Sequence, residues 1–246
     1  MSANITVNNS SLSKNDQTLW SHQSIATWRY SVENLPNGID LLDDHSRAHW
    51  LADCISHVLR ALSGFARVSI CDVATFSHGD GSFIPGSTET ELPTQLDEYL
   101  RSTMDIYYVS LVLDFICLDI DVDSSIRERL SHKDGYLLLT SNVNAGKILE
   151  EEDHYIDLSF MVENSIFSPI SHGRDNRALA ILNAPRLRVF TERLAQYPDL
   201  VFKEVDCDSN FVSWMRDHDL FDNHGFKIPE DIEAFERLLK ELNEEV

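Results

Sequence analysis

The stretch YYVSLVLDFICLDI, residues 107–120, decides the fold class of this chain of 246 residues. It is rich in β-branched and aromatic residues, which favour strands buried within a sheet. Asp114 and Asp119 interrupt its apolar run, and nowhere does the chain have the roughly 18 apolar residues of a membrane-spanning helix. The stretch therefore predicts a buried strand, or two strands around a bend, and we expect no membrane partner.

Further strands are predicted on both sides of this stretch. Short apolar or alternating segments that are bounded by glycine, proline and polar clusters are typical of strands. Five segments fit this description: part of 20–34, 66–76, 135–140, 154–161 and 200–205. Residues 77–93 are rich in glycine and proline and are predicted to form a loop.

The clearest helix follows Asp43. Asp43, Asp44 or Ser46 could cap its first turn, and Gly64 could end it. Its apolar residues recur at helical spacing; they are Trp50, Leu51, Cys54, Ile55, Val58, Leu59 and Leu62. Other helices are predicted over 94–103, 124–132, 174–182, 185–196 and 210–218, and from Pro229 onward.

The order of these elements indicates an α+β fold, because the strands cluster in the middle of the chain. We expect a central, mostly antiparallel or mixed sheet that is flanked by helices at both ends of the chain. Residues 1–17 are polar and are predicted to be a flexible N-terminal segment. Residues 18–246 are predicted to form a single domain.

Charge is the most unusual bulk property. The chain has 41 acidic and 20 basic residues, a formal net charge of -21. Such a field opposes binding to nucleic acid or to anionic membranes and attracts a basic protein partner. Acidity also aids solubility, and a salt-adapted host would share this composition. The N-terminal residues lack the apolar core of a signal peptide, so the expected location is cytoplasmic.

The four cysteines, Cys54, Cys71, Cys117 and Cys207, lie in or beside apolar runs and form no C-x-x-C pair. Such cysteines pack as small apolar side chains, and a zinc or redox site needs closer spacing. We expect reduced, buried thiols. The sequence also lacks G-x-S-x-G and the phosphate-binding G-x-x-x-x-G-K-[ST] pattern, so it assigns no catalytic residue and no cofactor.

Three carboxylates stand at alternate positions after the central strand, at Asp119, Asp121 and Asp123. On an extended chain they point to one side, where they could hold a divalent cation. The pattern resembles the DxD motif of haloacid-dehalogenase-type phosphatases, which implies a metal-dependent hydrolase using Asp119 and Asp121. The sequence departs from that family at Asp123, where those enzymes carry Thr or Val. The preferred interpretation is a set of acids at a strand end, one of which caps the next helix, so these three residues are only weak metal candidates.

A second weak metal candidate lies on the first helix, where His45, His49, Asp53 and His57 are spaced four apart. Residues at that spacing share one face of a helix. The zinc-protease motif needs Glu directly after its first histidine, and Ser46 stands there. A solvated helix edge is therefore the preferred interpretation.

Glu150, Glu151, Glu152 and Asp153 form the densest acidic run. We nominate these four residues as candidates for binding a basic partner, with an ordinary solvated loop as the alternative.

An acidic, motif-poor α+β chain of this size resembles the immunity proteins of bacterial polymorphic toxin systems. The residues that carry the likeness lie in 155–194: the 164–169 turn, Asp175-Asn176-Arg177 and Leu182-Asn183-Ala184-Pro185. The resemblance implies a heterodimer with a toxin domain, often a basic nuclease, whose active site is covered. A structural or adaptor protein and an enzyme remain alternatives, and the oligomeric state stays open.

Overall fold

The computed structural model describes residues 26–32, 43–75, 79–83, 91–103, 105–141, 156–171, 173–206 and 210–244. The strands are β1 (Ala26–Val32), β2 (Ala66–Thr75), β3 (Gly79–Phe83), β4 (Ile106–Ile120), β5 (Ile126–Ser141), β6 (Ile156–Val162), β7 (Ile170–Ser171), β8 (Arg174–Asp175), β9 (Leu200–Asp206), β10 (Phe221–Asp222) and β11 (Gly225–Phe226). The helices are α1 (Asp44–Ala61), α2 (Glu91–Ser102), α3 (Arg177–Leu194), α4 (Asn210–Asp217) and α5 (Ile232–Glu244), with a 3-10 turn, η2 (Ser165–Phe167).

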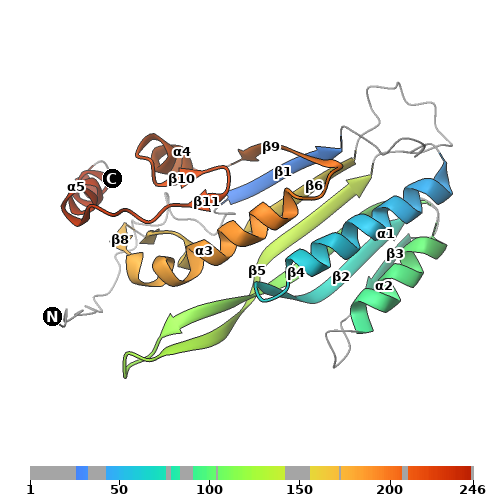
Figure 1. Ribbon diagram of the computed structural model, residues 1–246, viewed down its shortest axis with the longest axis horizontal. Helices are drawn as coiled ribbons and strands as arrows, with labels where there is room; N and C mark the ends of the chain where they lie inside the picture. Colours follow the sequence, from blue (N-terminus) through green and yellow to red (C-terminus); the bar gives the residue numbers. More distant parts are fainter. Residues whose placement is uncertain are drawn as a thin grey trace.

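Seven of the described strands form one sheet in the order β3-β2-β4-β5-β6-β1-β9 (Figure 1). Every neighbouring pair in it is antiparallel. The α+β class and the central antiparallel sheet are therefore confirmed. The predicted grouping of helices at the two chain ends fits only loosely, because α2 and α3 lie between strands in the sequence.

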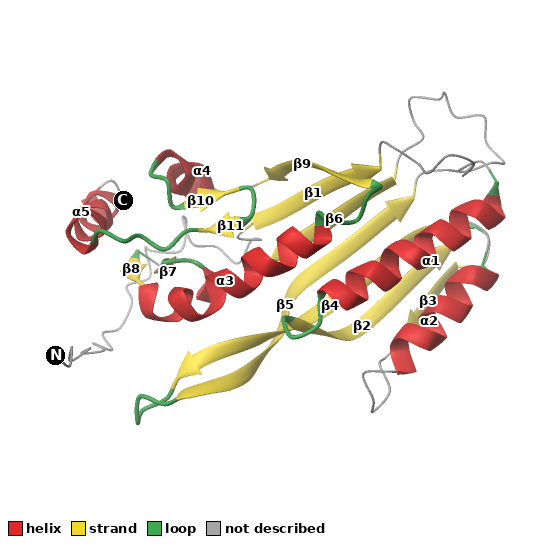
Figure 2. Ribbon diagram, viewed as in Figure 1, coloured by secondary structure: helices red, strands yellow, loops and turns green. Residues whose placement is uncertain are grey.

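Helices α1, α2 and α3 lie side by side over one face of the sheet (Figure 2). The alternation of a strand explains why, because successive side chains point to opposite faces. Along β4, Val109, Leu111, Leu113 and Phe115 are fully buried, whereas the residues between them are only half-buried. This buried row forms the core with the helices and ends in an aromatic cluster of Phe65, Phe115, Phe160, Phe167 and Phe190.

The first helix forms as its capping residues predict. The Asp43 side chain accepts a hydrogen bond from the Ser46 backbone N–H at 2.8 Å, which satisfies one of the unpaired donors of the first turn. After the helix, Gly64 has φ +74°, a left-handed conformation that glycine adopts without steric cost. The chain then turns directly into β2, as expected.

The helix predicted over 124–132 is wrong, because residues 124–125 end a turn and residues 126–132 belong to β5. Arg and Glu in this segment favour helices, but a tight turn precedes it, with Ser124 at φ 63°. The turn brings Ile126 opposite Ile120, and pairing with β4 then extends along the whole segment. Cross-strand contacts therefore override local helix propensity.

The loop predicted over 77–93 also needs correction, because it contains β3 and the start of α2. Strand β3 pairs with β2 from Thr75↔Gly79 to Cys71↔Phe83. Glycines weaken a strand but do not exclude it at a sheet edge, where β3 lies.

The two helices predicted over 174–182 and 185–196 are one continuous helix, α3, with Pro185 inside it. An internal proline costs about 3 kcal/mol because it removes one backbone hydrogen bond. Residues on both sides of it, including Ala184 and Leu187, are buried in one face, and their packing holds the helix together. The last helix starts at Ile232 instead of Pro229, and the Asp231 carboxylate accepts a bond from Ala234 N–H at 3.0 Å.

Within the described ranges, no helix combines the length and the apolar character needed to cross a membrane. The predicted N-terminal segment, residues 1–17, lies outside the described residues.

Candidate functional site: the β4–β5 arm

The hairpin of β4 and β5 extends beyond the rest of the sheet. Strand β2 accompanies β4 only as far as the pair Ala66↔Phe115, and β6 accompanies β5 only from Gly135. Residues 116–130, which we call the arm, therefore project as a two-stranded ribbon, at the lower left of Figure 1. The central stretch of the sequence thus supplies both a core strand and half of a projection.

A tight turn closes the tip of the arm. Ser124 N–H donates to the Asp121 carbonyl at 2.8 Å, and Asp121 N–H donates to the Ser125 carbonyl at 2.9 Å. The Asp123 carboxylate accepts bonds from the Ser125 hydroxyl at 2.5 Å and from its N–H at 3.0 Å. These two bonds, the hydroxyl bond above all, lower the pKa of Asp123. The tip is therefore held by its own hydrogen bonds.

One face of the arm carries ion pairs. Arg129 lies 3.0 Å from the Asp119 carboxylate, and Arg127 lies 3.0 Å from Asp121 and 3.6 Å from Asp123. All three carboxylates that the sequence proposes as metal ligands thus face arginines. Among the described residues, no three His, Cys, Asp or Glu side chains are grouped so that they could hold a metal ion.

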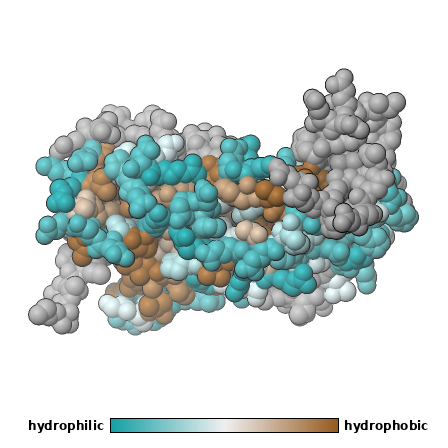
Figure 3. All heavy atoms as spheres, turned by 45° about the horizontal axis from the view of Figure 1, so that its top comes forward, coloured by the Kyte–Doolittle hydropathy of each residue, from teal (hydrophilic) through white to brown (hydrophobic). Residues whose placement is uncertain are grey.

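The opposite face of the arm is largely apolar. The cross-strand pairs on this face are Ile116↔Leu130, Leu118↔Glu128 and Ile120↔Ile126. Val122 at the tip is 101% exposed, and Ile126, Ile120 and Leu130 are 58%, 39% and 38% exposed. Figure 3 shows apolar side chains gathered at the lower left, the end of the molecule from which the arm projects. Contiguous exposed apolar side chains of this kind mark interaction surfaces.

Glu128 stands in the centre of the apolar face. It is exposed, and it has Ile126 and Leu130 two residues away on its own strand and Leu118 opposite. The arginines on either side of it point to the other face, where they pair with aspartates. Among the described residues, no basic side chain forms an ion pair with Glu128. The apolar face therefore presents one uncompensated negative charge.

Asn183 of α3 fastens the arm to the body of the molecule. Its amide oxygen accepts from Leu118 N–H at 2.8 Å, and its amide nitrogen donates to the Leu118 carbonyl at 2.8 Å. The same nitrogen donates to the Leu179 carbonyl at 2.9 Å, and the side chain is fully buried. The amide thus occupies the place of a neighbouring strand beside β4, and it limits movement of the arm at its root.

Polar contacts also fix the root on the β5 side, where the register shifts between Leu113 and Phe115. Lys133 has φ 60°, and its N–H donates to the Asp114 carboxylate at 2.9 Å. The Asn164 amide donates to the Ser131 hydroxyl at 2.6 Å and to Asp134 at 2.7 Å. A bulge of this kind bends and twists a ribbon, which directs the arm away from the sheet.

The histidine row of α1 forms contacts within the protein. Arg101 of α2 reaches His49 Nδ1 at 2.8 Å and the Asp53 carboxylate at 2.7 Å. His57 Nε2 lies 3.0 Å from the carbonyl of Arg193 in α3, and His45 is exposed. His49, Asp53 and His57 therefore connect α1 to α2 and α3, and the structure does not bring the row together around a common centre.

The described cysteines are buried, as the sequence predicts. Cys54, Cys71 and Cys117 are free thiols, and burial raises the pKa of Cys71 and of Cys117 to about 12. A thiol with so high a pKa is almost entirely protonated at neutral pH and is a poor nucleophile. Cys207 lies outside the described residues. So do the acidic candidates Glu150, Glu151, Glu152 and Asp153.

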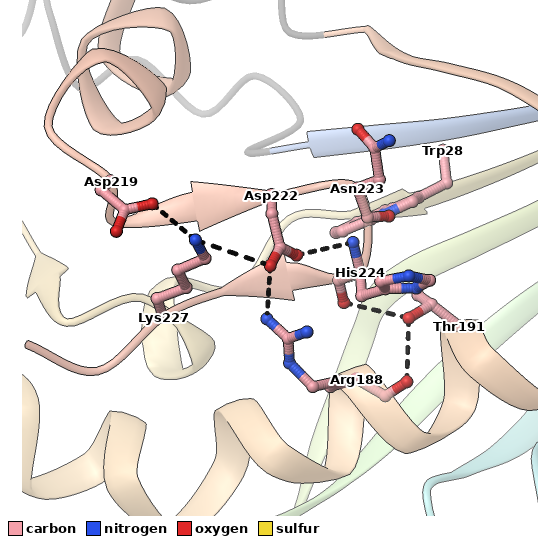
Figure 4. A network of polar contacts seen from close by, with 8 residues as sticks. All are labelled: Trp28, Arg188, Thr191, Asp219, Asp222, Asn223, His224 and Lys227. Atoms are coloured by element: carbon pink, nitrogen blue, oxygen red, sulfur yellow. Dashed lines mark hydrogen bonds and ion pairs between the residues drawn. The ribbon is translucent and has the colours of Figure 1, made fainter.

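Figure 4 shows a second polar cluster, which attaches the β10–β11 hairpin to α3 and β1. Arg188 donates to Asp222 at 2.9 Å, and the Thr191 hydroxyl donates to the His224 carbonyl at 3.0 Å. Trp28 of β1 donates its indole N–H to the Asn223 carbonyl at 2.9 Å. The bonds from Arg188, Thr191 and Trp28 join the hairpin to α3 and β1, so the cluster positions the hairpin.

We expect Asp222→Asn to lower the free energy of unfolding by about 1–2 kcal/mol, because a charge-assisted bond at a partly exposed site is lost. Burial raises the pKa of Asp222, but bonds from Arg188 and His224 N–H outweigh it, and the net pKa is lowered. The stabilisation is therefore present above the unfolded-state pKa and is lost as pH falls through the folded-state pKa. Urea unfolding should show a stability difference between the two proteins that is constant down to about pH 5 and shrinks as pH falls below about 4; a difference that stays constant in acid would contradict this.

The apolar face of the arm is the site that sequence reasoning missed. A usable signal was present, because Ile116, Leu118 and Ile120 alternate before a polar turn, and Ile126 and Leu130 alternate after it. Because residues 124–132 were predicted to be a helix, the alternation of Ile126 and Leu130 was not recognised as a strand pattern. Comparison of the chain with known protein families, with curated proteins and with solved structures found no match.

Proposed function

We propose that this chain is an acidic binding protein that neutralises a basic protein partner, and that the arm is its contact surface. In its most specific form the partner is a toxin domain, which the chain inhibits as an immunity protein by covering the active site. The observation that carries the proposal is the projecting arm, with Val122 fully exposed at its tip and apolar side chains behind it.

The apolar face supplies binding energy when it is covered. Removing apolar surface from water contributes about 25 cal/mol per Å². Ile120, Ile126 and Leu130 retain much of their exposure in this structure, so that contribution is unused within the described part of the chain. The ion pairs and Asn183 hold the ribbon in one shape, and such preorganisation lowers the entropic cost of association.

Charge selects the kind of partner. Residues 114–134 carry six acidic and three basic side chains, and the whole chain has a net charge of -21. A basic protein is drawn to this field, and its association rate falls as salt rises. A second copy of the chain would meet the same negative charge and be repelled. A narrow projecting ribbon also suits the obstruction of a concave site.

The hydrolase alternative has less support. It requires Asp119 and Asp121 to hold a cation, yet each of these carboxylates lies 3.0 Å from an arginine. An enzyme remains the second candidate only because the Asp119–Asp123 spacing resembles the DxD motif of haloacid-dehalogenase-type phosphatases.

The test begins with a photo-cross-linker, p-benzoylphenylalanine, in place of Val122 in the native cell. The captured protein is then produced alone, and its association with the unmodified chain is measured against salt concentration. We expect a basic protein whose association rate falls at least about tenfold between 50 and 500 mM salt, and whose own activity stops in the complex. An association rate that is independent of salt would overturn the charge argument.

A matched pair of variants tests the surface itself. Ile126 on the arm and Ile232 on α5 are both 58% exposed. Ile126→Asp should weaken the complex at least about tenfold, because a charge enters an apolar contact. Ile232→Asp should change affinity less than about twofold, since exposed substitutions outside an interface have small effects. Equal effects of the two variants would remove the arm from the interface.

A further inference from the structure

The two edges of the arm differ in how their backbone groups are used. Both backbone groups of Leu118 point away from β5, because Asn183 binds its N–H and its carbonyl. Opposed residues in an antiparallel ribbon either bond to each other or point outward on opposite edges. Glu128, the partner of Leu118, therefore directs its N–H and carbonyl to the outer edge of β5. Ile126 and Leu130 do the same, because the pattern repeats every two residues.

The β4 edge of the arm is satisfied within the protein. Ile116 N–H donates to the Phe65 carbonyl at 2.9 Å, and Ile120 N–H donates to the Asp119 side chain at 2.8 Å. Asn183 closes the position between them. Four backbone groups on this edge therefore already have partners within the protein.

The β5 edge is closed only at its root. There Glu163 N–H donates to the Asp134 carbonyl at 2.8 Å, and Asn164 binds Ser131 and Asp134. Strand β6 begins to pair at Gly135, so within the described residues no strand borders Ile126–Leu130. Natural proteins usually protect such an edge with charges, proline or a bulge. Here the residues whose backbone groups point to the open edge are Ile126, Glu128 and Leu130. Arg127 and Arg129 lie between them, and their side chains form ion pairs on the other face of the arm.

We infer that a strand of the basic partner adds to the outer edge of β5 between Ile126 and Leu130, which extends the arm to three strands. The inference rests on the proposed function and specifies its binding mode. Residues that bond across an antiparallel pair share a face of the sheet. The incoming strand therefore places apolar side chains beside Ile126 and Leu130 and a lysine or arginine beside Glu128, in the order apolar-x-basic-x-apolar.

Glu128 also decides between a partner strand and a second copy of the chain. Two arms paired about this position would set Glu128 against Glu128, and like charges directly opposite each other destabilise a strand pair. A basic residue in the same place gives a favourable cross-strand pair. Strand addition provides affinity through the backbone, and the alternate side chains provide specificity.

The probe is the peptide acetyl-Thr-Val-Thr-Lys-Thr-Val-Thr-amide, added to the ¹⁵N-labelled full chain and followed by NMR. We expect the backbone amides of Ile126, Glu128 and Leu130 to shift and to exchange more slowly with solvent. N-methylation of the Val and Lys amides should weaken binding more than about tenfold, because it removes the pairing hydrogen bonds. N-methylation of the two Thr amides beside the Lys should change the affinity less than about twofold, because these amides point away from β5.

The Lys residue of the peptide has its own control. Replacing it with Glu should weaken binding to the unmodified chain, and Glu128→Gln should weaken binding of the Lys peptide about threefold.

Equal binding of the two N-methylated peptides, or no change at the Ile126–Leu130 amides, would overturn strand addition. If Ile126→Asp still disrupts the complex with the captured protein in that case, the proposed function stands without this binding mode.

Discussion

Asn183→Asp is expected to lower the free energy of unfolding by about 3–5 kcal/mol, the largest effect of any single substitution considered, because it leaves a buried and unpaired charge. The asparagine amide donates to two carbonyls, those of Leu118 and Leu179. A carboxylate cannot donate and would face both carbonyl oxygens in a fully buried position. Chemical denaturation at pH 7 would measure the loss, and amide exchange near Leu118 should accelerate as the root of the arm loosens.

Asn243→Asp provides the control. Asn243 also donates to two carbonyls, those of Gly173 and Leu239, but it is exposed, so water can replace the lost bonds. We expect a loss below about 1 kcal/mol there. Burial raises the pKa of the carboxylate introduced at position 183, so the deficit of that variant should narrow as pH falls through the raised pKa. Equal losses in the two variants would show that the contact at Leu118 does not brace the arm.

Gly135→Ala is expected to cost about 2–3 kcal/mol, although the change would normally favour a strand. A Cβ atom on Gly135 would lie 2.3 Å from Cζ of Phe115, far inside contact distance. Phe115 cannot retreat, because it is fully buried against Phe65 and Phe167, with ring centroids 5.2 Å away in both cases. Urea unfolding would measure the loss.

A double-mutant cycle separates this clash from an intrinsic preference for glycine. Phe115→Leu alone should destabilise, because it removes a buried ring. In the Phe115→Leu background, however, Gly135→Ala should cost less than about 1 kcal/mol, since the obstructing atoms are gone. An undiminished cost would mean that the Phe115 ring is not the reason for the glycine.

Local sequence patterns were sufficient for the elements whose signals are local. The capping aspartate, the apolar stripe and Gly64 delimit α1, and the run from Tyr107 to Ile120 identifies β4. The clustering of strands in the middle of the chain indicated the α+β class and a mostly antiparallel or mixed sheet. Buried cysteines followed from their apolar neighbours. In each case the residues that determine the feature are near one another in the sequence, or are apolar enough to need burial anywhere.

Where local preference and distant pairing conflict, only the tertiary structure determined which structure the segment adopts. The segment IRERL, residues 126–130, has good helix formers, yet it pairs with β4 because a tight turn sets Ile126 opposite Ile120. Pro185 suggested a break in α3, but burial on both sides keeps the helix continuous. Asp119, Asp121 and Asp123 were weak candidates for a cation site, and strand pairing places Arg127 and Arg129 beside them. Cross-strand neighbours come from positions that a single stretch of sequence does not specify, so the arm and its unpaired edge could be seen only once the register was known.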